Sequence, residues 1–229
     1  MPHQLSGNES RRISGKALGI GIATGAYGLS FGAISVASGL SALQTQALSL
    51  LMFTGASQFA LVGVLGAGGG LVAAVLTAWL LGARNGLYAL SLAPTLRGSW
   101  PQRMGLAHWT IDETTAMALA HPEPLAAQRH AFWRTGLAIY ILWNLGTLVG
   151  ALSAAVLPEP RALGLDAAIP AAFIALLWPR LISRRAWAVA ATSAALAIAL
   201  TPVLRPGLPV LACAFVAIAA AALVKGTSS

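Results

Sequence analysis

The stretch ALGIGIATGAYGLSFGAISVA, residues 17–37, decides the class of fold. It carries no charged side chain and is as long as the ~20 apolar residues that cross a bilayer core. The apolar core of a cleaved signal peptide is only about 7 to 15 residues long. We therefore interpret the stretch, which follows Arg11, Arg12 and Lys16, as the first membrane helix. Residues 1–15 are expected to form a short cytoplasmic tail and residues 16–229 a single transmembrane domain.

Charge is scarce along the whole chain. Of its 229 residues, 57% are hydrophobic and 9% are charged, against roughly 25% charged in an average soluble domain, and the mean hydropathy is +0.76. These values exclude a soluble globular protein and indicate contact with the lipid bilayer. The net charge of +8 comes from scattered basic residues, which argues against a nucleic-acid partner. Cys213 is the one cysteine, and we expect neither a metal nor a cofactor.

Charged residues and prolines divide the rest of the chain into segments of membrane-spanning length. Residues 135–158, 186–204 and 206–224 are uncharged and can each span, and a further segment begins near Leu163. Residues 47–121 are apolar but interrupted by polar side chains, as broken or re-entrant helices are. The expected fold is an all-α, polytopic transmembrane helical bundle with about six to eight membrane segments.

Basic residues indicate the orientation, because they collect in cytoplasmic loops. The cluster before residue 17 places the N-terminus in the cytoplasm, and Lys225 suits a cytoplasmic C-terminus. Eight crossings keep both ends inside but place Arg97 and Arg103 on the opposite side. Six crossings, with two of the middle segments re-entrant, keep the same ends with a better charge balance. The sequence leaves both topologies open.

Glycines recur in the first predicted helix, at positions 21, 25, 28 and 32. Small residues four apart let two helix backbones approach closely in a membrane. We favour this packing role over a role in lining a substrate path.

A small polar group interrupts the segment from residue 47 to 65. Gly55 and Ala56 precede Ser57 and Gln58, with Thr54 one turn before Gln58. Such a sequence can open a helix so that backbone groups meet a polar substrate. The alternative is an interhelical hydrogen bond from Gln58 with tight packing at Gly55. We keep Gly55, Ser57 and Gln58 as candidate substrate-binding residues.

A second polar group surrounds Arg84. Arg84 shares a helical face with Tyr88, and Asn85 lies beside it. The guanidinium fork of arginine holds a carboxylate through two hydrogen bonds, which suits an amino-acid substrate. Alternatively, Arg84 neutralises Asp112 or Glu113 as a structural ion pair, and the two arrangements can alternate in one transport cycle. We keep Arg84, Asn85 and Tyr88 as candidate substrate-binding residues.

The third polar group lies in residues 104–121. His108, Asp112 and Thr115 are expected on one helical face, with Glu113 turned away. A carboxylate in a low-dielectric cavity is suited to carry a coupling proton or to meet a substrate ammonium. The alternative places both acids in solvent near a helix N-terminus. Asp112 and Glu113 are candidates for substrate binding, and these two with His108 are candidates for proton coupling.

Nucleotide-binding and catalytic motifs are absent. The sequence has no G-x-x-x-x-G-K-[ST], H-E-x-x-H or C-x-x-C. We therefore expect no enzyme and no catalytic residues. Without nucleotide chemistry, the simplest energy source for transport is the proton gradient, which makes this a candidate secondary transporter.

Three motifs together resemble the AzlC family of azaleucine-resistance-type branched-chain amino acid permeases. They are Phe53–Ala60 (FTGASQFA), Ala83–Pro94 (ARNGLYALSLAP) and Ile111–Thr114 (IDET). The resemblance implies an exporter of branched-chain and related hydrophobic amino acids in the bacterial inner membrane. It also implies a small hydrophobic membrane partner of the AzlD type. Family members often carry Thr-Asp-Glu where this chain has Ile111-Asp112-Glu113, a change that keeps both carboxylates.

The sequence therefore predicts a proton-driven exporter of Leu, Ile or Val, with Met as a further candidate. The alternative is a non-transporting membrane subunit or a passive channel for small solutes, in which the polar residues only hold helices together.

Overall fold

The computed structural model describes residues 5–96, 98–156 and 181–226, together with positions 171, 174, 177 and 178. Within these residues all regular structure is helical, which confirms the all-α class. The helices are α1 Gly7–Ala37, α2 Ala42–Leu51, α3 Ala56–Gly66, α4 Leu71–Gly82, α5 Arg84–Leu92, α6 Trp100–Trp109, α7 Asp112–Leu119, α8 Leu125–Ala155, α10 Arg184–Leu200 and α11 Leu208–Gly226. In the described residues, three helical stretches are long and apolar enough to cross a membrane: Gly7–Ala37, Leu71–Leu92 and Leu125–Ala154.

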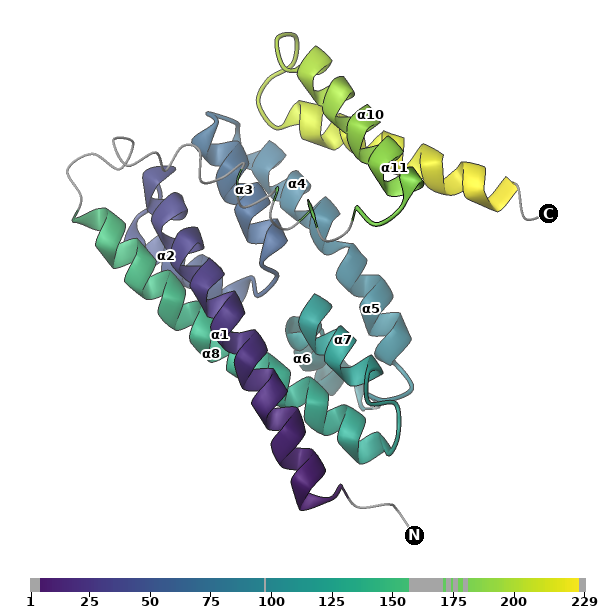
Figure 1. Cartoon of the computed structure of the whole chain (residues 1–229). Helices are drawn as coiled ribbons and strands as arrows, with labels where there is room; N and C mark the ends of the chain where they lie inside the picture. The colour runs from purple at the N-terminus through teal and green to yellow at the C-terminus, as the bar shows by residue number, and fades with distance from the viewer. Residues whose placement is uncertain are drawn as a thin grey trace.

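The long helices α1 and α8 lie side by side and run in the same direction (Figure 1). Near their first turns, Ser10 Oγ lies 3.0 Å from His130 Nε2. Each helix has 31 residues, or about 46 Å at 1.5 Å per residue, which exceeds the hydrocarbon core. Residues 7–15, expected as part of a tail, are therefore the polar first turns of α1.

Glycines allow the backbones of α1 and α8 to touch. A Cβ atom built on Gly28 would lie 2.6 Å from the carbonyl oxygen of Trp143, and one on Gly32 would overlap the carbonyl oxygen of Thr147. Real Cβ atoms do not approach backbone atoms this closely. The structure thus confirms that the glycine pattern serves helix packing.

Helices α2 and α3 form a hairpin that opens toward the C-terminal end of α1. Ser41 caps α2, and the chain leaves the helix at Met52 and resumes it at Ala56 after Gly55, whose φ is +52°. α3 then returns beside the end of α1, where a Cβ on Gly66 would lie 2.6 Å from Ser38 Oγ. The expected break in this segment is therefore confirmed.

Helices α6 and α7 form a second hairpin that opens toward the opposite end of the molecule. The chain between them is extended at Thr110 and Ile111, and the Thr114 hydroxyl accepts a 3.0 Å hydrogen bond from the Ile111 N–H. α7 then runs back toward the first turns of α1, where Met117 packs in a cluster with Ile13.

This interruption corrects one prediction. His108, Asp112 and Thr115 do not share one helical face, because His108 belongs to α6 whereas Asp112 and Thr115 belong to α7. The extended backbone at Thr110 and Ile111 redirects the chain between the two helices.

Helices α4 and α5 form one stretch of 22 residues, interrupted at Ala83. It begins after the loop that follows α3 and ends where Leu92 packs against Ala118 and Phe132 of α7 and α8. Figure 1 shows this stretch crossing from the open end of the first hairpin to that of the second.

The tips of the two hairpins meet against α8. The ring centroid of Phe53, at the first tip, lies 5.1 Å from that of Tyr140, 5.9 Å from that of His108 and 6.1 Å from that of Trp109. Phe53 and Ile111 belong to the same buried core. The two breaks in helical structure therefore lie close together inside the molecule.

Side-chain hydrogen bonds fasten α2 to α8. Gln46 Nε2 donates to Asn144 Oδ1 at 3.2 Å, and Ser49 Oγ donates to Thr147 Oγ1 at 3.2 Å. Bonds of this kind join helices where lipid offers no competing partner.

Helices α10 and α11 form a separate pair beside α4 (Figure 1). They have 17 and 19 residues, and the Cys213 thiol lies 3.2 Å from the carbonyl oxygen of Ser193. The segment predicted from residue 163 to 179 falls largely outside the described residues, so the expected count of six to eight membrane segments stays a prediction.

Candidate functional site

An ion pair joins α5 to α7 near the hairpin tips. Arg84 is the first residue of α5 and Asp112 the first residue of α7, and Arg84 Nη1 lies 3.2 Å from Asp112 Oδ2. The two side chains are 30% and 20% exposed, so both charges are largely shielded from solvent. Asp112 also lies at the positive end of the α7 dipole, where a carboxylate is stabilised. Of the two arrangements left open for Arg84, the structure contains the pairing with Asp112.

In the described residues, buried polar atoms without hydrogen-bond partners concentrate near the helix breaks that precede α3, α5 and α7. Nine buried side-chain atoms in the described residues lack a partner, and six of them lie at or next to the three helix breaks. An unpaired buried polar group costs about 1–3 kcal/mol, so such a concentration indicates a place prepared for a polar ligand or water. The six atoms are Thr54 Oγ1, Ser57 Oγ, Gln58 Oε1, Arg84 Nε, Asn85 Oδ1 and Thr115 Oγ1.

Ser57 connects the first hairpin to the Arg84 region. It is 1% exposed in the first turn of α3, and a Cβ built on Gly82 would lie 3.4 Å from its hydroxyl oxygen. The Ser57 hydroxyl therefore faces α4 two residues before Arg84. It has no hydrogen-bond partner among the described residues.

Gln58 makes the interhelical hydrogen bond that the sequence analysis kept as an alternative, and its side-chain oxygen has no partner in the described residues. Its Nε2 donates to the carbonyl oxygen of Leu48 at 3.2 Å, which holds α3 against α2. Its Oε1 is buried without a partner in the described part of the chain. Tight packing at Gly55 is not observed, since a Cβ there would have no neighbour within 4 Å.

Gly55 is needed for its backbone conformation. Its φ of +52° with ψ of −89° is a combination that side chains with a Cβ rarely adopt. The residue ends the extended tip and starts α3, which has no side-chain N-cap. The first backbone N–H groups of α3 thus give this tip a partial positive charge.

Three further predicted residues lie on the same two helices as the ion pair, and His108 lies on α6. Asn85 follows Arg84 and is half-buried, as is Tyr88 one turn later on α5. Glu113 is half-buried beside Asp112 in the first turn of α7. His108 lies apart, between the rings of Phe53 and Tyr140, with centroid distances of 5.9 Å to each.

The sequence interpretation missed the aromatic cluster at the hairpin tips. Phe53, Trp109 and Tyr140 surround His108 from the first hairpin, the second hairpin and α8. No local pattern joins these residues, because they are brought together by the packing of three distant segments. In the residues that the structure describes, no three His, Cys, Asp or Glu side chains are placed to hold a metal ion.

A comparison with known protein families identifies the family of this chain. A family model described as "AzlC protein" matches residues 19–157. The chain belongs to the AzlC family. The matched residues contain every candidate substrate-binding and proton-coupling residue named above, both hairpins and most of α1 and α8. The polar site therefore lies within the residues that the AzlC family model matches.

Curated relatives of this AzlC chain are membrane proteins. An uncharacterized membrane protein of Helicobacter pylori (strain ATCC 700392 / 26695) is 30% identical over 126 residues, 55% of this chain and 55% of its own length. The inner membrane protein YgaZ of Escherichia coli (strain K12) is 30% identical over 131 residues, 54% of this chain and 52% of its own length. The chain spans about half the length of the curated relatives it matches. No solved structure matches it.

Proposed function

We propose that this AzlC protein is a secondary transporter that exports branched-chain and related hydrophobic amino acids across the bacterial inner membrane. The export is driven by the proton gradient and works together with a small membrane partner of the AzlD type. One observation carries the proposal: a shielded ion pair between Arg84 and Asp112 lies among buried polar atoms that have no partner in the described residues.

The ion pair has the two charges that an amino-acid zwitterion needs. Arg84 receives the substrate carboxylate through a charge-assisted hydrogen bond, and Asp112 receives the ammonium group. In the resting protein these side chains neutralise each other at 3.2 Å. When substrate binds, its carboxylate takes the place of Asp112 beside Arg84, and its ammonium group takes the place of Arg84 beside Asp112. Each charge therefore keeps an opposite charge next to it in the low-dielectric interior.

The tip of the first hairpin adds to the carboxylate site. Half-helix N-termini attract anionic substrate groups in transporters, and α3 begins here with Ser57 in its first turn. The Ser57 hydroxyl and the uncapped backbone of α3 complete the hydrogen bonds to a carboxylate held by Arg84. The aromatic cluster around Phe53 provides the apolar wall for an aliphatic side chain.

We assign the exchange of the coupling proton to the same acidic residues. Glu113, or Asp112 when it is separated from Arg84, takes up a proton from outside when substrate has left and releases it on the cytoplasmic side. His108, among aromatic rings at the adjacent tip, is the proposed third group in this exchange.

The proposed topology has the two hairpins enter the membrane from opposite faces. α1, α4–α5 and α8 cross the bilayer, whereas α2–α3 and α6–α7 reach only to its middle and return. The basic first turns of α1 place the N-terminus in the cytoplasm. Irregular backbone is tolerated at such depth only where protein or water surrounds it, as it is at the two tips.

Leucine efflux tests the function. A bacterial host without its own exporters is loaded with a leucine-containing dipeptide, and intracellular leucine is followed over time. The cells carry this protein alone, the protein with a candidate AzlD-type partner, or both with an uncoupler. We expect leucine to fall when the protein is present and the proton gradient is intact.

Each result decides between functions. Efflux that continues down its gradient with the uncoupler indicates a passive channel. Leucine that stays high in every arm, although the protein is in the membrane, rejects the amino-acid substrate. A requirement for the second chain identifies this protein as one subunit of the exporter.

Ser57→Ala is expected to separate substrate binding from stability. The loss of one hydrogen bond to the substrate is worth about 1 kcal/mol, or roughly a fivefold rise in the apparent KM for leucine. The temperature of unfolding in detergent should not fall, because the Ser57 hydroxyl has no partner among the described residues.

Ser49→Ala is the matched control. The Ser49 hydroxyl donates to Thr147 at 3.2 Å between α2 and α8, so its loss should lower stability and leave the KM unchanged. Lower stability with an unchanged KM in Ser57→Ala would mean that this serine is structural.

A further inference from the structure

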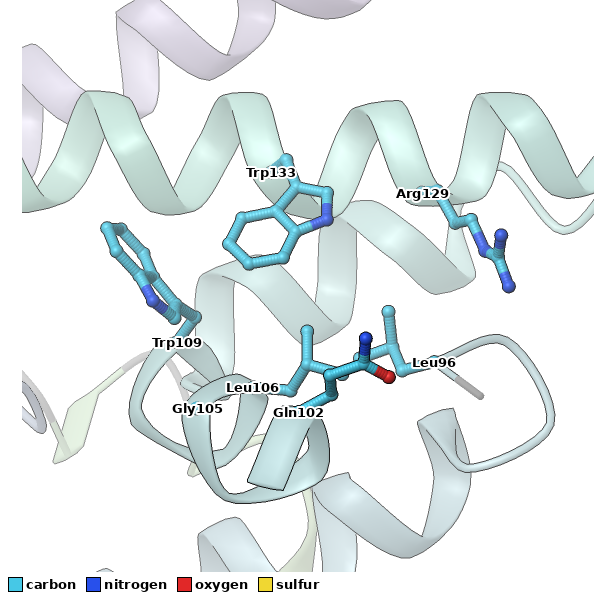
Figure 2. A pocket seen from close by; sticks show the side chains of 7 residues that line it. All are labelled: Leu96, Gln102, Gly105, Leu106, Trp109, Arg129 and Trp133. Atoms are coloured by element: carbon cyan, nitrogen blue, oxygen red, sulfur yellow. The ribbon is translucent and has the colours of Figure 1, made fainter. Parts of the chain in front are cut away.

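A cavity lies outside the polar site, between α6, α8 and the loop that joins α5 to α6. It is a hollow that is widely open at the protein surface, with a volume of about 450 Å³. Figure 2 shows Trp109 and Trp133 on one side of it, Leu106 and Gln102 below, and Arg129 at the edge. The walls are thus mainly apolar, with a cation at one end.

Arg129 is held at this edge by the loop that follows α5. Its Nε donates to the carbonyl oxygen of Thr95 at 2.9 Å, and the Thr95 hydroxyl donates to Gln128 Oε1 at 2.6 Å. The first bond holds the guanidinium at Nε and leaves its terminal N–H groups for another acceptor, and the second bond holds the loop at Thr95 against α8. No ion pair of Arg129 with an acid occurs in the described residues.

The position of Arg129 along α8 corresponds to the depth of lipid headgroups. The uncharged part of α8 begins at residue 135, so Arg129 lies six residues earlier, about 9 Å along the axis. Trp133 lies two residues before the start of the apolar run, and Trp109 packs against it with ring centroids 5.7 Å apart. The cation therefore lies in the headgroup layer while the apolar walls face the acyl-chain layer.

The neighbouring first turns of α1 make this layer strongly basic. Ser10 and Ser14 of α1 lie 3.0 and 3.3 Å from His130 Nε2, so Arg11 and Arg12 are at about the same level as Arg129. Basic pockets between helices at the cytoplasmic surface attract anionic lipid headgroups. A cation at the level of the headgroups and an apolar wall deeper in the bilayer match a lipid, whose phosphate lies at the surface and whose acyl chain lies deeper.

We propose that this cavity binds one anionic phospholipid, with its phosphate on Arg129 and its first acyl carbons against Leu106, Trp109 and Trp133. The site does not depend on transport activity; it uses only the membrane placement of α8 given under the proposed topology. Trp109 also packs against Phe53, with ring centroids 6.1 Å apart, so a bound lipid contacts the residue that leads to the second hairpin tip.

Native mass spectrometry of the full chain in detergent tests the site. The protein is titrated with phosphatidylglycerol or with phosphatidylcholine of the same acyl chains. We expect one phosphatidylglycerol to bind about five- to tenfold more tightly. Arg129→Gln should remove this preference, whereas Arg134→Gln, which removes an equal charge from the exposed face of α8, should keep it.

A second variant tests the acyl-chain part without touching the charge. A Cβ on Gly105 has no neighbour within 4 Å, and Gly105 lines the cavity, so Gly105→Leu should fill the space and weaken phosphatidylglycerol binding without lowering the unfolding temperature. Equal affinity for both lipids, or an unchanged preference in Arg129→Gln, would overturn the proposal. Competition by millimolar inorganic phosphate as effective as by the lipid would also overturn it, since the ligand would then be a free anion.

Discussion

Replacing Arg84 by alanine is expected to stop leucine efflux while the protein still reaches the membrane. The change removes the guanidinium that lies 3.2 Å from Asp112 and would receive the substrate carboxylate. Hydrogen bonds to charged groups contribute about 1.5–3 kcal/mol, so substrate binding should weaken at least roughly tenfold. Transport should fall further, because Asp112 then keeps a charge without its cation.

Asp112→Asn is expected to give the same loss for a different reason. The asparagine side chain cannot exchange a proton or neutralise the substrate ammonium, although its size and polar atoms are almost unchanged. Efflux is measured with the dipeptide-loading assay, and the amount of protein in the membrane is measured in the same cells. Wild-type efflux by both single variants would reject this site.

The double variant Arg84→Gln with Asp112→Asn separates a substrate site from a structural ion pair. If the two residues only neutralise each other, removing both charges leaves none unpaired, and efflux should recover relative to either single change. If they hold the zwitterion, the double variant should be as inactive as the singles. Arg103→Gln, an exposed change on α6 that also removes one positive charge, should retain wild-type efflux.

Local chemistry was sufficient to predict the break in the first hairpin. Gly55 is the residue type that accepts a φ of +52°, and the polar residues after it are poor candidates for a lipid-facing helix. The pairing of Arg84 with an acid was one of the two arrangements that the sequence left open, because an isolated arginine at membrane depth needs a partner. The sequence could not choose between Asp112 and Glu113, since that choice depends on how α5 packs against α7.

The break in the second hairpin was only partly predicted: interrupted helices were expected in residues 47–121, and a helix N-terminus beside the two acids was one alternative, but the common face of His108, Asp112 and Thr115 required a continuous helix there. Asp112 and Glu113 precede Thr114, and acidic residues favour the first turn of a helix. The Thr114 hydroxyl binds the carbonyl oxygens of Trp109 and Ile111 at 2.8 and 3.0 Å and replaces helical bonds across the break. The placement of His108 and Asp112 on one continuous helix in residues 104–121 gave too much weight to the apolar composition of the segment. It gave too little weight to the signal for a helix start at Asp112.

The aromatic cluster and the lipid cavity could not be derived from sequence. Phe53, Trp109 and Tyr140 lie in segments separated by tens of residues, and no local sequence pattern links them. Their meeting depends on both hairpins reaching the same level of α8. The contact between α1 and α8 holds α8 in position. We therefore expect the site to require the glycines that bring these two helices together.

Gly32→Ala is expected to destabilise the protein strongly through this interface. The added Cβ would overlap the Thr147 carbonyl oxygen and lie 2.7 Å from the Ala151 backbone nitrogen. Both are backbone atoms of α8, so no side-chain rotation relieves the overlap and the two helices must separate. Overpacking of this kind costs typically about 1–3 kcal/mol, and Gly32→Val should cost more because it adds two further methyl groups.

Gly19→Ala on the same helix is the matched control. A Cβ at Gly19 has no neighbour within 4 Å, and alanine favours a helix over glycine by about 1 kcal/mol in soluble hosts. The same substitution should therefore lower the unfolding temperature in detergent at position 32 and leave it unchanged or higher at position 19. Equal effects at both positions would show that α1 and α8 are not in backbone contact.

Separation of α1 from α8 should also reach the polar site. Displacement of the α8 backbone at Thr147 would shift the surface on which α2 packs, a larger change than the loss of the single Ser49–Thr147 hydrogen bond, and α2 leads directly into the Gly55 break. Gly32→Ala should therefore raise the KM for leucine in the protein that remains folded, although Gly32 is not proposed to contact the substrate. An unchanged KM, together with the lower stability, would mean that the hairpin tip keeps its position independently of the helix pair.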